Sequence, residues 1–111
     1  MDKEDKKLLE LAAKAVGIDL KWKLGFGLSE MSYYDVGGLD QPWNPLKDDG
    51  DAFRLMVDCG LTVCTDGEGT VSASEAWNPG GVFVTQSING DKREATRRAI
   101  VRAAAIGVSY E

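Results

Sequence analysis

Three stretches of helical periodicity, each followed by a glycine and an apolar residue, limit the folds open to this chain. Glycine readily adopts the left-handed conformation that ends many helices, and the apolar residue after it packs back on the last turn. We therefore predict three helices that end at Gly17-Ile18, Gly60-Leu61 and Gly107-Val108. Within each, apolar side chains recur at intervals of three and four residues, as on a helix face turned toward a core. The predicted inward residues are Leu8, Leu11, Ala12, Ala15 and Val16 in the first helix, Ala52, Leu55, Met56 and Cys59 in the second, and Ala95, Ala99, Ile100, Ala103 and Ile106 in the third.

The sequence also marks where the second and third helices start. Asp91 followed by Glu94 has the spacing of a capping box, in which each side chain satisfies a free amide of the first turn. Asn44-Pro45 is typical of a short turn, and the acidic stretch 48–51 suits the positive end of a helix dipole. We expect the first helix to cover residues 3–16.

Between the helices the pattern changes to short β-strands separated by glycine-containing turns. The alternation of apolar and polar residues predicts strands at 20–24, 32–36, 61–64, 70–73 and 81–86, and Gly37-Gly38 ends the second of them. The predicted order is α-β-β-α-β-β-β-α. It indicates an α+β fold, with three helices packed on an antiparallel sheet.

Length and composition fit one globular unit. A chain of 111 residues is too short for two independent cores, so we predict a single α+β domain over residues 1–111. With 43% hydrophobic and 28% charged residues, disorder and membrane residence are both disfavoured. No apolar run approaches the ~20 residues of a spanning helix, and the charged start is unlike a signal peptide. We expect a cytoplasmic protein with no membrane partner.

The chain has no histidine and two cysteines, which removes several kinds of active site. Without histidine, a Ser-His-Asp triad within one chain is excluded and the commonest general base is missing. Cys59 and Cys64 supply too few ligands for zinc, and we expect both to be reduced thiols rather than a disulfide. The segment 25–27 lacks the residues of a phosphate loop. We predict no cofactor and no resident metal, and favour a non-enzymatic protein.

The acidic cluster Asp48, Asp49 and Asp51 has two interpretations. Such carboxylates bind hard cations like calcium, but their spacing is not that of an EF-hand loop. Favourable electrostatics at the start of the second helix explains the cluster without a metal, and we favour this interpretation.

The third helix carries a basic group made of Lys92, Arg93, Arg97, Arg98 and Arg102. Arg93 and Arg97 are four residues apart, as are Arg98 and Arg102, so two basic ridges flank the alanine-rich face. One interpretation is a patch for phosphates or for an acidic partner. The other is a solvated face paired with Glu94 or with the acidic stretch before the second helix. We favour the second, because the chain has a net charge of −5.

Trp43 and Trp77 both precede Asn-Pro, in a tripeptide repeated 34 residues apart. They are either exposed recognition aromatics or loop residues that cover the core with the indole N–H bonded to a carbonyl. We favour the core interpretation for both, and still more for Trp22 on its alternating strand.

The segments 43–52 and 95–105, together with Leu55, carry a resemblance to a known group of proteins. They resemble small uncharacterised phage and prophage proteins of the phage alpha-beta-alpha sandwich domain type, with NinX-like proteins as relatives. The likeness extends to residues 8–18 and to most of the chain from Trp43 onward. It implies an α+β sandwich encoded by a phage or prophage and acting in the bacterial cytoplasm. It supplies no catalytic residues.

Together these observations favour a phage accessory protein that binds a host protein, a phage protein or its own copy. The candidate partner-binding residues are Trp43, Trp77, Arg93, Arg97, Arg98 and Arg102. The alternatives are nucleic-acid or nucleotide binding through the arginines of the third helix and, less favoured, a small carboxylate enzyme.

Overall fold

Helix ends are where this sequence determines the backbone most directly. In the computed structural model, which describes residues 2–25, 27, 29–65, 69–75 and 81–109, Gly17 has a φ of +74°. The Ile18 amide donates to the Ala13 carbonyl at 2.9 Å and the Gly17 amide to the Lys14 carbonyl at 3.2 Å, which together form a Schellman ending. Gly60 ends the second helix in the same left-handed region, with a φ of +65°. Two of the three predicted helix ends are therefore confirmed.

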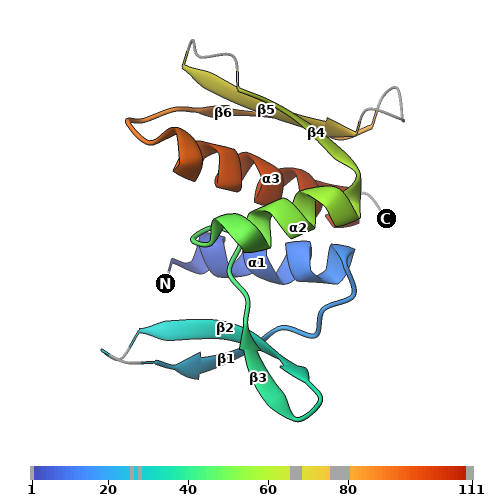
Figure 1. Cartoon of the computed structure of the whole chain (residues 1–111). Helices are drawn as coiled ribbons and strands as arrows, with labels where there is room; N and C mark the ends of the chain where they lie inside the picture. Colours follow the sequence, from blue (N-terminus) through green and yellow to red (C-terminus); the bar gives the residue numbers. More distant parts are fainter. Residues whose placement is uncertain (1, 26, 28, 66–68, 76–80, 110–111) are drawn as a thin grey trace.

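The described part of the chain forms three helices and six strands. In chain order they are α1 (Lys3–Ala15), β1 (Lys21–Leu24), β2 (Glu30–Val36), β3 (Leu39–Pro42), α2 (Asp49–Cys59), β4 (Leu61–Thr65), β5 (Thr70–Glu75), β6 (Phe83–Ser87) and α3 (Lys92–Ser109). The strands form two antiparallel three-stranded sheets, sheet A in the order β1-β2-β3 and sheet B in the order β4-β5-β6. Figure 1 shows the helices between the two sheets, with α3 directly beneath sheet B.

The predicted α+β class is confirmed. The structure adds one strand to the predicted order and divides the strands between two antiparallel sheets, where one was predicted. Gly37 and Gly38 have φ values of +61° and +89°, so the chain turns back tightly after Val36 and pairs Leu39 with it. Positive φ at both central residues is the requirement of the hairpin turn whose twist matches that of the strands. The glycines that were expected only to end a strand thus create β3 and complete sheet A.

Two clusters of buried apolar side chains form the core, and α3 contributes to both. Ile100, Val101 and Ala104 belong to the cluster shared with α1 and α2, which also contains Leu9 and Leu55. On the other side of the helix, Ala95, Ala99 and Ala103 pack against sheet B in a cluster with Val71, Ala73, Val82 and Val84. The predicted inward residues Ala95, Ala99, Ile100 and Ala103 are confirmed, and all are at most 5% exposed.

Sheet A is joined to α1 by polar as well as apolar contacts. The Lys6 Nζ donates to Glu30 in β2 at 2.7 Å and lies 4.9 Å from the centre of the Trp22 ring in β1. The hydrogen bond from Lys6 lowers the pKa of Glu30 below its usual value. Trp22 is half-buried against the first cluster, in agreement with its predicted core role.

Two details of the predicted helices are wrong. Leu9 was absent from the predicted inward face of α1, yet it is fully buried, whereas Ala15 is exposed. The inward face is therefore rotated slightly from the predicted stripe. The third helix does not end at Gly107 but continues to Ser109. A Cβ at Gly107 would lie 3.6 Å from the Glu75 carboxylate and 3.9 Å from Val82, so this glycine sits where the helix packs against sheet B.

Within the described residues, no helix combines the length and the apolar character needed to cross a bilayer.

Replacing Leu9 tests the position of the α1 interface. We expect Leu9→Ala to lower the free energy of unfolding by about 2–5 kcal/mol, because it opens a cavity in a fully buried site. Leu24→Ala is the matched control. Leu24 is 66% exposed, so its truncation should change stability by less than about 0.5 kcal/mol. Urea unfolding followed by circular dichroism measures both, and equal effects would contradict the assignment.

Candidate functional site

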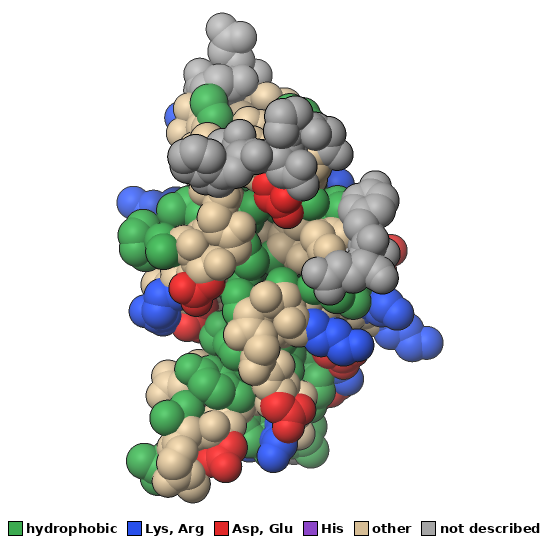
Figure 2. All heavy atoms as spheres, turned by 90° about the vertical axis from the view of Figure 1, so that its right-hand side faces the viewer, with side chains coloured by type: hydrophobic (Ala, Val, Ile, Leu, Met, Phe, Trp, Pro, Cys, Tyr) green, Lys and Arg blue, Asp and Glu red, His purple; other side chains and the backbone are tan. Residues whose placement is uncertain are grey.

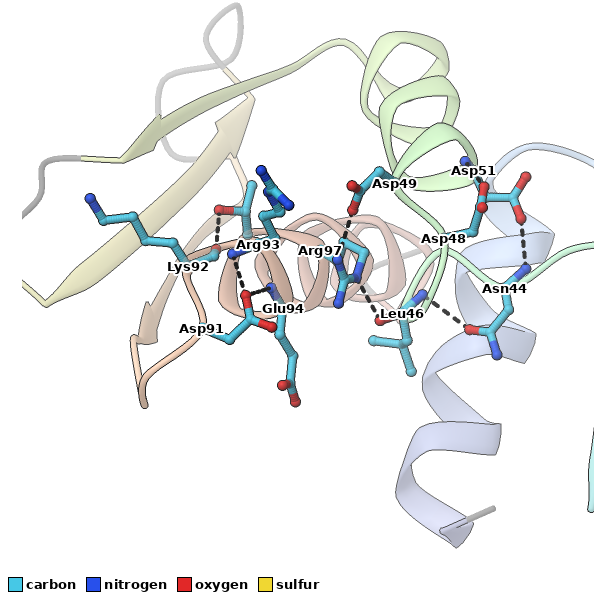
Figure 3. Close-up of polar contacts among 11 residues, drawn as sticks. Asn44, Leu46, Asp48, Asp49, Asp51, Asp91, Lys92, Arg93, Glu94 and Arg97 are labelled. Atoms are coloured by element: carbon cyan, nitrogen blue, oxygen red, sulfur yellow. Dashed lines mark hydrogen bonds and ion pairs between the residues drawn. The ribbon is translucent and has the colours of Figure 1, made fainter.

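Arg97 links α3 to the start of α2. Its Nε donates to the Leu46 carbonyl at 2.9 Å and its Nη1 to the Asp49 carboxylate at 2.7 Å, as Figure 3 shows. The Arg97 side chain is 15% exposed. The guanidinium is thus part of the packing between two helices, and the predicted pairing with the acidic stretch is confirmed.

Arg98 and Arg102 connect α3 to two further elements. Arg98 donates to both carboxylate oxygens of Asp5 in α1, at 3.0 and 3.3 Å, and this bond raises the pKa of Arg98 above its usual value. The Arg102 Nη1 donates to the Thr85 carbonyl and to the Gln86 side chain, each at 2.9 Å. Three candidate arginines therefore bind three different neighbours of α3 instead of forming one patch.

Lys92 and Arg93 differ from the other cations of the helix. They lie in the first turn of α3, where the Asp91 side chain accepts from the amides of Arg93 and Glu94 at 2.9 and 3.2 Å. This is the Asp91 half of the predicted capping box. Among the described residues, no carboxylate lies within 4.0 Å of the Lys92 or Arg93 side-chain nitrogens. Both side chains are exposed and their charges are available to a ligand.

The acidic cluster is distributed among three structural roles, which Figure 3 displays. Asp48 caps α2 by accepting from the Asp51 amide at 2.8 Å, and Asp49 pairs with Arg97. Asp51, only 8% exposed, accepts from the Asn44 amide at 2.9 Å and from Arg54 at 2.7 Å. In the part of the chain that the structure describes, no three His, Cys, Asp or Glu side chains are placed to hold a metal ion together.

The two tryptophan candidates have different outcomes. Trp43 is 5% exposed and belongs to the cluster shared by α1, α2 and α3, in agreement with the favoured core interpretation. Its carbonyl accepts a hydrogen bond from the buried Ser32 hydroxyl. The Trp43 side chain therefore leaves little surface for a partner. Trp77 lies outside the described residues, so its role stays a prediction.

The cysteines are both free thiols, at the end of α2 and in β4. Burial raises the pKa of the half-buried Cys59, and the negative charges of Asp58 and Glu75 add to this effect. A raised pKa keeps the thiol protonated near neutral pH and makes it a poor nucleophile. Cys64 is exposed on β4. Cys59 therefore has the surroundings of a structural rather than a catalytic cysteine.

An open groove, which we call the α2–α3 groove, lies beside Lys92 and Arg93. Its volume is about 380 Å³ and its exposed lining is mostly apolar. Phe53, Met56 and Ile100 supply apolar walls, and Thr65 comes from the end of β4. Lys92 and Arg93 line the groove from the first turn of α3, and the ion pair between Asp49 and Arg97 belongs to the same lining. The size falls within the range of ligand-binding pockets. This groove is the candidate functional site.

Phe53 is the groove residue that sequence analysis missed. It is 61% exposed, and Val57, one turn further along α2, is 57% exposed. The two residues lie outside the predicted inward stripe of the helix and four positions apart. This spacing indicates an interaction site in the sequence itself. Residues four apart are neighbours on a helix, and adjacent apolar side chains on its solvent face are typical of a surface that binds a partner.

Charged side chains of both signs are mixed on one face of the molecule (Figure 2). The face in Figure 2 has acidic and basic side chains interspersed, with hydrophobic side chains emerging between them. Val36 and Leu39, at the turn of the β2–β3 hairpin, are 50% and 75% exposed and lie next to each other across the turn. They form a second exposed apolar surface.

Comparison with known proteins does not assign a function to the α2–α3 groove. No family model, no curated protein and no solved structure matches the chain.

The contrast between Arg97 and Arg93 is testable by stability. We expect Arg97→Ala to lower the free energy of unfolding by about 1–3 kcal/mol, since it leaves the Leu46 carbonyl and Asp49 without their donor. Arg93→Ala should change it by less than about 0.5 kcal/mol. Thermal and urea unfolding of both variants measure the difference. Equal losses would contradict the division into structural and available cations.

Proposed function

We propose that this chain is a non-enzymatic protein-binding module and that the α2–α3 groove is its binding surface. The observation that carries the proposal is the combination of an open apolar groove, an exposed aromatic side chain at its wall, and two lining cations without an ion pair to any described residue. Interfaces concentrate their binding energy on such aromatic and cationic anchors, surrounded by weaker contacts. An exposed Phe53 costs solubility, and a partner that covers it removes this cost.

Non-enzymatic action is supported by the state of the titratable groups. The described carboxylates of the acidic cluster are each occupied by a structural hydrogen bond or ion pair. Cys59 has a raised pKa, and the sequence has no histidine. A binding role needs none of these groups as acid, base or nucleophile.

The biological setting is part of the proposal. The likeness of residues 43–52 and 95–105 to phage alpha-beta-alpha sandwich proteins supports a phage or prophage accessory protein acting in the host cytoplasm. The partner is then a host or phage protein. A second copy of the chain is less favoured, because a net charge of −5 on each copy opposes association.

Nucleic-acid binding through α3 has less support than the sequence suggested. Phosphate binding needs several free cations on one face. Arg97, Arg98 and Arg102 bind groups within the chain, and of the candidate arginines only Arg93 has an exposed side chain without such an ion pair among the described residues.

Substitution of Phe53 tests the binding surface. We expect a tagged wild-type chain to retain a specific protein from a bacterial host lysate, and Phe53→Asp to reduce the retained amount by ~10-fold or more, as for a central interface residue. Phe83→Asp is the matched control, since Phe83 is 67% exposed but lies on sheet B. Quantitative mass spectrometry of the eluates measures retention. A protein retained equally by both variants, or no retained protein at all, would contradict the proposal.

A further inference from the structure

Sheet B has a defined pattern of backbone hydrogen bonds. The Glu75 amide of β5 donates to the Val82 carbonyl at 3.1 Å, on the side of β6. In an antiparallel sheet, successive residues of a central strand bond to opposite neighbours. The odd-numbered residues of β5 therefore bond to β6, and the even-numbered residues bond to β4.

This alternation leaves one side of β4 open. Ser74 and Ser72 of β5 are opposite Thr62 and Cys64, so these two residues of β4 make the ladder bonds. The backbone N–H and C=O groups of Leu61, Val63 and Thr65 then point away from β5. Among the described residues, no backbone hydrogen bond outside the sheet ladder involves these three.

The opposite edge of sheet B, formed by β6, carries a side chain that binds its backbone. In β6, the outward Thr85 carbonyl accepts from Arg102 at 2.9 Å. An exposed edge strand is a site where another chain can pair, and proteins commonly block such edges. Arg102 blocks the β6 edge, whereas β4 has no such side chain on it among the described residues.

The open edge of β4 adjoins the α2–α3 groove. Thr65 belongs to both, because its side chain lines the groove together with Phe53 and Met56 of α2. In Figure 1, α2 and β4 meet at Gly60 and diverge from there, with α3 behind the space between them. Side chains of a strand alternate between its two faces. A strand laid along β4 would therefore direct every second side chain toward the apolar wall of the groove.

The positive charges of Lys92 and Arg93 indicate which kind of peptide segment the groove binds. Lys92 and Arg93 lie in the first turn of α3, where cations oppose the helix dipole, so they do not serve the stability of the helix. Both residues are positively charged in a chain whose net charge is −5. Their charge is complementary to a segment that carries carboxylates.

From these observations we infer that the α2–α3 groove receives an extended acidic segment of another protein, which adds to sheet B as a fourth strand beside β4. The groove-facing side chains of this segment occupy every second position. They are apolar where they contact Phe53 and Met56, and acidic where they reach Lys92 and Arg93. Backbone hydrogen bonds provide affinity, and the groove provides specificity, as in other cases of strand addition. This inference rests on the proposed function, since it specifies the partner of the same groove.

The experiment uses the full ¹⁵N-labelled chain and a defined probe, an acetylated and amidated seven-residue peptide of the sequence Glu-Thr-Val-Thr-Val-Thr-Glu, whose Glu and Val side chains lie on one face of an extended strand. A peptide with Lys in place of Glu tests charge, and a twelve-nucleotide oligothymidylate tests for nucleic acid. We expect the acidic peptide to shift the resonances of Phe53, Met56 and Thr65 and to slow hydrogen exchange of the Val63 and Thr65 amides. The Lys peptide should bind ~10-fold more weakly or not at all.

Two pairs of variants separate the contributions. Thr65→Pro removes the outward N–H at an edge position where proline is tolerated, and should weaken the acidic peptide ~10-fold relative to Thr65→Ala, which keeps the N–H. The double variant Lys92→Glu with Arg93→Glu should weaken it at least ~10-fold. Its control, Lys3→Glu with Lys7→Glu, makes the same change in net charge on α1 and should leave affinity within ~2-fold.

The outcomes are distinguishable. Binding that shifts groove resonances but is insensitive to Thr65→Pro and gives no amide protection would overturn strand addition and leave the protein-binding function standing. Absence of peptide binding at millimolar concentration, with a protein still captured through Phe53, would also overturn only this inference. Binding of the oligothymidylate in place of the peptide would overturn both.

Discussion

The rest of the structure depends on the packing of α3, whose two sides are buried in different apolar clusters. Alanine makes this arrangement feasible. Ala95, Ala99 and Ala103 let sheet B approach the helix closely, and Ala104 does the same for the opposite cluster. A larger side chain at these positions would force the layers apart, because protein interiors are packed too tightly to absorb extra methylene groups.

Polar contacts of α3 fix the same neighbours in place. Arg97 binds the start of α2, Arg98 binds Asp5 of α1, and Arg102 binds the β6 edge. Each guanidinium is directional, so each contact orients one layer relative to the helix. As a consequence, most cationic side chains of α3 bind groups within the chain. The charge that stays available, on Lys92 and Arg93, lies at the one end of the helix that adjoins an apolar groove and an open strand edge.

Local chemistry in the sequence predicted local structure well. Gly17 and Gly60 adopt the predicted left-handed conformation, and Asp91 caps α3 as its spacing indicated. The prediction failed where tertiary contacts decide. Gly107 remains helical against sheet B, and Leu9, which lies next to the predicted stripe in sequence, is fully buried.

Long-range contacts and one strand were less predictable from the sequence, and the candidate site depends on long-range contacts too. The pairing of Arg98 with Asp5 joins residues 93 positions apart, and no local pattern specifies such a contact. The strand β3 contains Asp40, Gln41 and Pro42 and is exposed throughout, so it has no apolar alternation to read. Its formation depends on the tight turn at Gly37-Gly38. The groove itself combines α2, α3 and β4. Sequence analysis identified its cations Lys92 and Arg93 but not its apolar wall, which includes Phe53.

Native-state hydrogen exchange of the full chain tests most directly whether α3 unites the two clusters. If it does, the slowest amides of α1, α3 and β5 exchange through the same opening, with free energies that agree within about 1 kcal/mol and equal the free energy of global unfolding. The central amides around Leu9, Val101 and Val71 report on these three elements, each from a side chain that is fully buried. A substantially lower opening free energy for α1 than for α3 and β5 would show that the clusters open separately and would contradict this account.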